Sequence, residues 1–386
     1  MTGSTPSRYF PQRARFRVVP LTRKTTSLLA AIAVALLGLP AAAPAAPVPP
    51  GFTVGISPQT PAGDDDYSLM ARAGLRSLRL PLNWARIEPH SPYLVEPDFS
   101  DFDRSVTIAA RHGLRIFPFV WGTPSWIATE ELIEPVRHGW DGRAWASFLR
   151  RAVERYGPGG AFWRENPGLP AQPIRAWEIW NEANIVSFSA RPDPRRYARL
   201  LRISGRAIHR ADPGAKAILG GLFGRPLQVP PNIASGDYLN RVYGAGGVKP
   251  FFDGVALHPY VADAAAMRPQ IRNLRRIMRN HGDAATPLYV TELGWGSDSF
   301  ETRWERGPLG QARELDQALS ILTANHRRWR VAGVWWFSWA DAGPFCQFCD
   351  SAGLLTERRE AKPAWYSFNA WTGGDSGAVP RAGIGE

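Results

Sequence analysis

The sequence contains few of the residues that metal and redox sites need. Only two cysteines, Cys346 and Cys349, occur among its 386 residues, and they stand in a C-x-x-C arrangement. A zinc site would need more ligands, and neither a histidine nor a second cysteine pair lies nearby. Two interpretations remain. A redox-active pair would suit a cytosolic protein, and a short structural disulfide would suit an exported one.

Phosphate-binding loops are also missing. No G-x-G-x-x-G motif follows the first apolar run that resembles a strand, and Gly-rich positions such as Gly220-Gly221 are predicted to form tight turns. A nucleotide-dependent enzyme is therefore disfavoured, and no nucleotide cofactor is predicted.

The N-terminal apolar run, from Leu28 to Leu39, is shorter than the roughly 20 residues that span a bilayer. Six basic residues and no acidic residue precede it, and a small-residue stretch at 41–46 follows it. This order is typical of a secretory signal peptide, so residues 1–46 are predicted to be removed. The mature protein would then be secreted or associated with the cell envelope, and export favours a disulfide between Cys346 and Cys349. A membrane anchor that stays attached is the alternative.

The basic excess is modest once that segment is set aside. The excess of Lys and Arg over Asp and Glu falls from 12 to six, and only four residues of the whole chain are lysines. No cluster of basic residues with interleaved aromatics is evident in the sequence. The pattern predicts a solvated basic surface and no nucleic-acid partner.

From Gly51 onward, strand-like and helix-like segments alternate. Eight short runs rich in Val, Ile, Leu and Phe are predicted to be strands, at 52–57, 76–82, 115–121, 174–180, 216–221, 253–258, 287–292 and 332–338. Helical patterns follow them at 64–74, 101–112, 140–156, 194–209, 237–243, 264–280, 310–329 and 363–371. Helical crossovers require parallel strands, so eight such units predict an α/β fold, the (β/α)8 TIM barrel.

This barrel is predicted to form one domain at 47–372, followed by a Gly-rich, frayed tail at 373–386. An open doubly wound sheet is the alternative architecture, but the missing glycine motif argues against it.

In such a barrel the active site lies at the carboxyl ends of the strands. The fourth strand is followed by Asn181-Glu182 and the seventh ends in Glu292, so the two carboxylates would face each other across the barrel mouth. Cleavage of a glycosidic bond needs such a pair, because one acid protonates the leaving oxygen while the other attacks the anomeric carbon or activates water. Arg79 of the second strand would keep one carboxylate ionised, and an apolar, Trp-lined wall would keep the other protonated.

The sequence around these residues resembles clan A glycoside hydrolases. The matching segments include W-E-I-W-N-E at 177–182, V-T-E-L-G-W at 290–295, R-L-P at 79–81 and H-P-Y at 258–260. The resemblance covers residues 52–371, and bacterial members of families 39 and 5 are the most similar. Ala183 stands where many relatives have proline, which puts the subfamily in doubt but not the carboxylate pair.

The resemblance implies a role for each matching position. Glu182 would be the general acid/base and Glu292 the nucleophile. Arg79 and Tyr260 would be partners of Glu292, and His258 would be a neighbour of the acid/base. Asn181 would bind the substrate 2-hydroxyl, and Trp336 would form the floor under the attacked sugar.

Ten of the 16 tryptophans fall into two groups by position. Those at strand ends or in loops could stack on sugar rings: Trp84, Trp121, Trp126, Trp295 and Trp339. Those in helical segments are predicted to pack in the core: Trp145, Trp163, Trp329, Trp365 and Trp371.

Together these features predict a secreted retaining β-glycosidase that hydrolyses a polysaccharide or oligosaccharide by double displacement, as a family 39-like β-xylosidase or an endo-β-glycanase. A non-catalytic carbohydrate-binding barrel and a transglycosylase with the same carboxylates are the alternatives. Carbohydrate is the predicted partner, and neither a metal nor a cofactor is predicted because this chemistry needs none.

Overall fold

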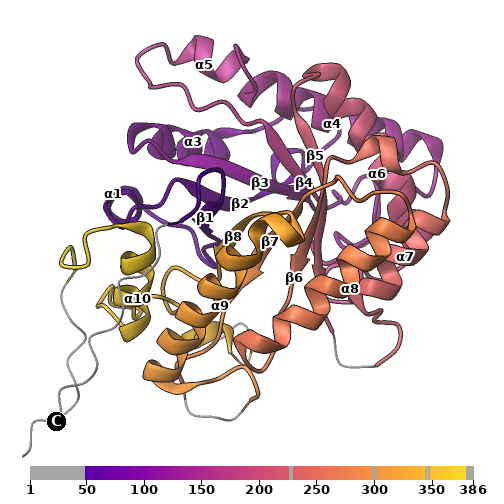
Figure 1. Cartoon of the computed structure of the whole chain (residues 1–386). Helices are drawn as coiled ribbons and strands as arrows, with labels where there is room; N and C mark the ends of the chain where they lie inside the picture. The colour runs from indigo at the N-terminus through magenta and orange to yellow at the C-terminus, as the bar shows by residue number, and fades with distance from the viewer. Residues whose placement is uncertain (1–47, 226–228, 299–301, 344–345, 347, 380–386) are drawn as a thin grey trace, which may run out of the picture. The chain divides into compact units, whose positions relative to one another are not determined.

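The predicted strands pair in chain order into a closed parallel barrel (Figure 1). Their bounds are β1 (Thr53–Ile56), β2 (Ser77–Asn83), β3 (Arg115–Trp121), β4 (Ala176–Ile179), β5 (Lys216–Phe223), β6 (Gly254–His258), β7 (Leu288–Leu293) and β8 (Val331–Trp336). The computed structural model describes residues 48–225, 229–298, 302–343, 346 and 348–379. The predicted signal segment, 1–46, lies outside the described residues. The predicted barrel is confirmed.

A helix follows each strand, as predicted. These helices are α1 (Asp64–Arg72), α3 (Ser100–Arg111), α4 (Gly139–Tyr156), α6 (Pro194–Ala211), α7 (Ser235–Gly244), α8 (Met267–Asn280), α9 (Gly307–Trp329) and α10 (Pro363–Thr372). Two short helices, α2 (Trp84–Ile87) and α5 (Ala161–Glu165), were not predicted. Among the described residues, no helix is both long enough and apolar enough to cross a membrane.

Local sequence explains where the helices begin. At the start of α6, the Asp193 side chain accepts hydrogen bonds from the backbone N–H groups of Arg195 and Arg196, and Pro194 takes the first helical position. Both features satisfy or remove amide donors that a helix start leaves unpaired.

The strands carry one hydrophobic cluster inside the barrel and another between the strands and the helices. Phe117, Ile218, Ala256 and Trp335 form a small cluster, and a far larger cluster contains the strand side chains that pack against the helices. Because side chains alternate along a strand, the first set lies on the interior face. The interior is thus filled, and the functional site must lie at the mouth of the barrel.

The predicted tail starts later than the sequence suggested. The N–H of Gly374 donates to the Asn369 carbonyl, and the indole of Trp365 donates to the Ser376 carbonyl. Ala378 and Val379 pack against the main core. The prediction of fraying was therefore wrong for 373–379, because the residues between the glycines have partners on the barrel, while 380–386 lie outside the described residues.

Candidate active site

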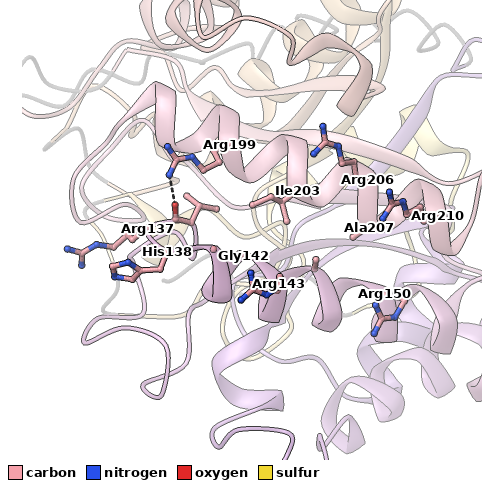
Figure 2. Close-up of a pocket in the computed structure, with 13 residues that line it drawn as sticks. Arg137, His138, Gly142, Arg143, Arg150, Arg199, Ile203, Arg206, Ala207 and Arg210 are labelled. Carbon is pink, nitrogen blue, oxygen red and sulfur yellow. Dashed lines mark hydrogen bonds between the residues drawn. The ribbon is translucent and has the colours of Figure 1, made fainter.

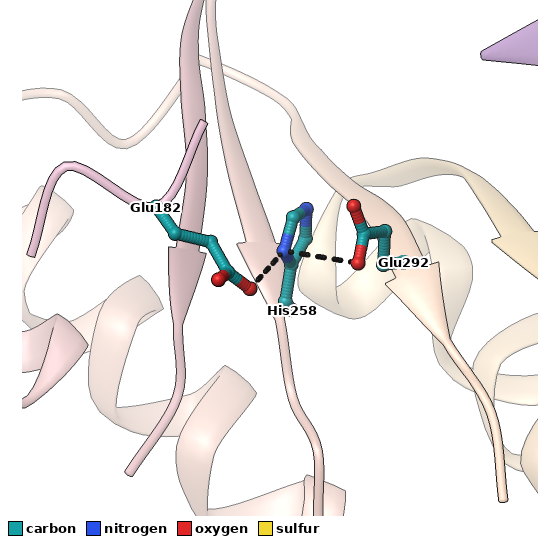
Figure 3. Close-up of side chains that lie close together, drawn as sticks. All are labelled: Glu182, His258 and Glu292. Atoms are coloured by element: carbon teal, nitrogen blue, oxygen red, sulfur yellow. Dashed lines mark hydrogen bonds and ion pairs between the residues drawn. The ribbon is translucent and has the colours of Figure 1, made fainter. Parts of the chain in front are cut away.

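The two predicted carboxylates lie together at the mouth of the barrel. Figure 3 shows the ring of His258, at the end of β6, between the side chains of Glu182 and Glu292. Its Nδ1 atom is 2.7 Å from Oε1 of Glu182 and 3.6 Å from Oε2 of Glu292. One carboxylate oxygen of each glutamate and a ring nitrogen of His258 all lie within 4.8 Å of one another. The structure therefore brings Glu182, which follows β4, together with residues of β6 and β7.

The backbone before Glu182 is unusual. Trp180 and Glu182 have positive φ angles of 68° and 40°, a region that residues other than glycine seldom occupy. The N–H of Glu182 donates to the carbonyl of Gly221 at 2.9 Å, which holds this turn against β5. Such strained positions cluster at functional sites, where surrounding contacts maintain them. Here the strain directs the Glu182 side chain over the mouth.

Arg79 joins the residues of the site through its guanidinium group. Its Nη1 atom donates to Glu292 at 2.6 Å, and its Nη2 atom donates to the Asn181 amide oxygen at 2.7 Å. The side chain is fully buried, and its guanidinium carbon lies 4.2 Å from the centre of the Phe119 ring. Burial alone would lower the pKa of Arg79, but Glu178 and Glu292 outweigh it and raise the pKa above its ordinary value. Arg79 is thus a permanent positive charge beside Glu292.

Glu178 is a buried third carboxylate that the sequence analysis did not identify. It accepts two hydrogen bonds from Arg79, at 2.8 Å from Nε and 3.0 Å from Nη2. It also accepts the N–H of Gly221 at 2.7 Å and the hydroxyl of Thr291 at 3.3 Å. This fork-to-fork pair fixes the orientation of the guanidinium. A charged residue inside the apolar strand at 174–180 was the available signal, because a buried charge requires a partner.

His258 is held as a neutral imidazole. Burial, reinforced by the charge of Arg79, lowers its pKa well below the ordinary value. Its Nε2 atom lies 3.0 Å from the hydroxyl of Thr291, which accepts from Nε2 while it donates to Glu178 and can donate to Nε2 when it turns away from Glu178. His258 can therefore donate from Nδ1 to an ionised Glu182 or accept from a protonated one. This arrangement suits a neighbour that changes its protonation state.

Gly221 makes room for that histidine. A Cβ atom at this position would lie 1.9 Å from Nε2 of His258. The prediction that Gly220-Gly221 form a tight turn was wrong, because both residues lie within β5 where its pairing with β6 shifts register. Such irregularities are common next to active sites because they redirect side chains.

The two glutamates have different electrostatic environments. Burial, together with the charge of Glu292, raises the pKa of Glu182 well above its ordinary value. Burial also raises the pKa of Glu292, but Arg79 and the hydroxyl of Tyr260, which donates to Oε2 at 2.8 Å, oppose that rise. Only Glu292 touches a fixed cation. These environments favour a proton on Glu182 and the negative charge on Glu292.

The three residues Glu182, His258 and Glu292 have the spacing of a metal site. However, the oxygens of Glu292 already accept hydrogen bonds from Arg79 and Tyr260. A divalent cation there would sit beside a fixed guanidinium, and the like charges would repel each other. The donor set therefore fits the exchange of a proton better than the binding of a metal.

Cys346 and Cys349 form the predicted disulfide in the loop after β8. Phe348, between the two cysteines, packs edge-on against Tyr260 with ring centres 5.1 Å apart. Tyr260 in turn hydrogen-bonds Glu292. The bridged loop therefore contacts a residue that touches one of the carboxylates.

We expect Cys346→Ser/Cys349→Ser to lower kcat/KM about tenfold, since Phe348 would no longer be fixed against Tyr260 and small displacements near a reacting group are costly. The double variant should lose at most about 2 kcal/mol of unfolding free energy, because the loop that the disulfide closes is very short. Steady-state kinetics and thermal unfolding would measure both. Phe348→Ala should reproduce the kinetic loss with the disulfide intact. Unchanged activity in the double serine variant would exclude a role for the disulfide.

Trp336 and Trp295 do not face the site. Trp336 is 3% exposed and Trp295 fully buried, and both belong to the cluster between the strands and the helices. The indole of Trp295 donates to the Val261 carbonyl. These two assignments were wrong because the interior face of β8 carries Trp335, which places Phe337 on the same side by alternation. Half-buried Phe337 packs against Tyr260, with ring centres 6.3 Å apart.

The other strand-end tryptophans differ in exposure. Trp84 and Trp339 are buried, with their indoles donating to Glu88 and Asp66, so they are structural. Trp121 and Trp126 are half-buried. Trp121 stays a candidate for substrate contact through the exposed part of its ring, since its Nε1 atom is buried without a hydrogen-bond partner among the described residues. All five helical tryptophans are buried, as predicted.

Comparison with known proteins confirms the barrel fold and the resemblance to glycoside hydrolases of families 39 and 5. No family model and no curated protein matches the sequence. Solved structures match over the barrel. A family 39 glycoside hydrolase from Bacteroides cellulosilyticus has a TM-score of 0.60 and 21% identity, with 83% of this chain and 63% of that chain covered. The chain thus spans less than two thirds of that protein's length.

Two further solved structures are similar. A monomeric β-xylosidase from Caulobacter crescentus has a TM-score of 0.59 at 18% identity, covering 84% of this chain and 68% of that chain. An exo-β-1,4-mannosidase from an Opitutaceae bacterium has a TM-score of 0.58 at 17% identity, covering 85% and 60%. At these identities the likeness shows the fold.

Proposed function

We propose that this chain is a retaining β-glycosidase with Glu292 as nucleophile and Glu182 as general acid/base. The observation that carries the proposal is the unequal environment of two carboxylates whose oxygens lie within 4.8 Å of each other. Carboxyl groups about 5–5.5 Å apart suit a covalent intermediate, whereas inverting enzymes leave about 6.5–9.5 Å for a water molecule. The short separation supports double displacement.

Each of these side chains then has a role in one or both steps of the double displacement. Glu292, ionised beside Arg79, attacks the anomeric carbon while Glu182 protonates the leaving oxygen. A covalent glycosyl–Glu292 ester forms and the aglycone departs with the proton of Glu182. Glu182, now ionised, removes a proton from water, and the resulting hydroxyl displaces Glu292. His258 accompanies both states of Glu182 because its Nδ1 atom can donate or accept.

Similarity to solved structures supports a choice of substrate class. The β-xylosidase and the exo-β-mannosidase share the barrel, so we propose β-xylosides first and other β-linked glycosides next. We also propose that the chain is exported with removal of 1–46, which the disulfide supports because such bonds persist in oxidising compartments. N-terminal sequencing of the exported protein would test this second proposal.

The direct test is hydrolysis of a panel of aryl β-glycosides and polysaccharides, with NMR of the first-formed anomer. Release of a β-anomer from a β-glycoside supports retention, and release of an α-anomer would contradict it. Transfer to an added alcohol in preference to water would favour a transglycosylase. Binding of an oligosaccharide without any cleavage would favour the carbohydrate-binding barrel.

The pH profile of kcat/KM should be bell-shaped. Activity rises with pH as Glu292 loses its proton, and it falls again as Glu182 loses the proton that the leaving group needs. Both pKa values are raised, and that of Glu182 is raised further, so both limbs should lie above the ordinary glutamate pKa of about 4.3. With a leaving group that needs no protonation, Glu182→Ala should lack the alkaline limb. Its persistence there would contradict the assignment.

A further inference from the structure

A groove of about 380 Å³ lies between α4 and α6 (Figure 2). Six arginines line it: Arg137, Arg143, Arg150, Arg199, Arg206 and Arg210. Figure 2 shows those of α4 along one wall and those of α6 along the other. We call it the arginine groove. The prediction of a basic surface without clusters was wrong here, because the fold joins two helices far apart in the sequence.

Helix geometry explains the groove. Arg143 and Arg150 are seven residues apart, as are Arg199 and Arg206, so each pair lies on one helix face about 10 Å apart along the axis. Small residues form the floor. At Gly142 a Cβ atom would lie 2.8 Å from Cδ1 of Ile203 on α6, so the glycine allows the close approach of the two helices.

The arginine groove carries uncompensated positive charge. All six arginines are exposed, and no acidic residue lines the groove. Of these six arginines, only Arg150 has a carboxylate of a described residue within 4.0 Å of its side chain, that of Glu154 at 3.8 Å. Arg199 donates to the Val136 carbonyl and Arg206 lies over the Phe251 ring, neither of which neutralises charge. Converging like charges favour a ligand of opposite sign.

We propose that the arginine groove binds an anionic polysaccharide through its carboxylate or sulfate groups. The planar guanidinium pairs with such groups through two parallel hydrogen bonds. Arginines that recur about every 10 Å along each helix can pair with anionic groups that recur along an extended chain. At the start of α4, Trp140 is 45% exposed and stacks against His138 of the groove, a flat apolar surface suited to a sugar ring.

The position of the groove links it to the barrel mouth. In a (β/α)8 barrel each helix begins on the side where the preceding strand ends, so α4 and α6 both begin at the mouth. A polymer bound from Arg210 towards Arg137 would therefore extend to the rim. The anion site itself does not depend on the proposed hydrolysis. Only the choice of a polysaccharide over other polyanions rests on the proposed function.

The test compares two triple variants that remove the same charge. Arg143→Gln/Arg206→Gln/Arg210→Gln alters the groove, and Arg268→Gln/Arg272→Gln/Arg279→Gln alters exposed arginines of α8. Both are made with and without Glu292→Gln, which prevents cleavage during binding. Affinity electrophoresis and calorimetry would use polygalacturonate against its methyl ester and dextran sulfate against dextran, to separate carboxylate from sulfate recognition. Duplex DNA and phosphatidylglycerol vesicles are the competing polyanions.

We expect the groove variant to lose about tenfold in affinity for polygalacturonate or dextran sulfate and the α8 variant less than twofold, with weak binding of the neutral polymers. Hydrolysis of a neutral aryl glycoside should be unchanged in both, so failure of the proposed function is seen separately from failure of the groove. Equal losses in the two variants would overturn the proposal. So would absence of polysaccharide binding, or tighter groove-dependent binding of DNA or vesicles.

Discussion

Glu292→Ala is expected to lower kcat/KM by at least about 10⁴-fold on any glycoside that the wild-type chain cleaves, because the proposed double displacement forms its covalent intermediate on this carboxylate. Glu182→Ala should lose about 10²–10⁴-fold, and least with an activated leaving group that departs without a proton. Glu182 is buried and the Glu292 side chain is only 12% exposed, so circular dichroism and thermal unfolding must show that each variant folds. Steady-state kinetics on one aryl glycoside would then measure the losses.

Azide separates the two roles. In Glu292→Ala, azide can attack the anomeric carbon directly and give the inverted, α-glycosyl azide. In Glu182→Ala the covalent intermediate still forms, and azide then gives the retained, β-glycosyl azide. Glu130→Ala, in the exposed loop after β3, is the matched control and should retain full activity. Activity near that of the wild type in either Glu182→Ala or Glu292→Ala would refute the catalytic role of the carboxylate pair.

The fold and the pair were predictable because they rest on local patterns. Each strand is a short apolar run, and each run ends where the barrel places its chemistry. Glu182 and Glu292 stand at two such ends, so their meeting at the mouth followed from chain order and parallel pairing alone. The direction of individual side chains did not follow, because it depends on register.

Two examples show why register could not be read from the sequence. Thr291 and Glu292 are neighbours in β7, yet Thr291 contacts His258 and Glu292 contacts Arg79. Regular alternation would send neighbours to opposite faces, and it fails where the pairing of β7 with β8 shifts between Val290 and Leu293. For β8, alternation places Trp335 and Trp336 on opposite faces, but only the closed barrel shows that Trp335 is on the inner one.

The buried pair of Arg79 and Glu178 predicts the second large effect. Glu178→Ala would leave a fully buried guanidinium without its bidentate partner, and breaking a buried pair on one side costs about 3–5 kcal/mol. We expect that loss of unfolding free energy in urea. The same substitution at Glu154, whose pair with Arg150 is about half exposed, should cost less than about 0.5 kcal/mol.

The same variant should also lose activity beyond its loss of stability. Glu178 pairs with Nε and Nη2 of Arg79, whereas Glu292 pairs with Nη1, so Glu178 acts through Arg79 and is a positioning residue. Without it the guanidinium can rotate, and Glu292 and Asn181 would each lose a fixed donor. We expect kcat to fall about 10²-fold at a temperature where the variant is fully folded, with a smaller change in KM. Glu178→Gln keeps one hydrogen bond to Arg79 and should recover part of the loss. If Glu178→Ala lowers the free energy of unfolding by less than about 1 kcal/mol and keeps its kcat, Glu178 is not needed to hold the guanidinium.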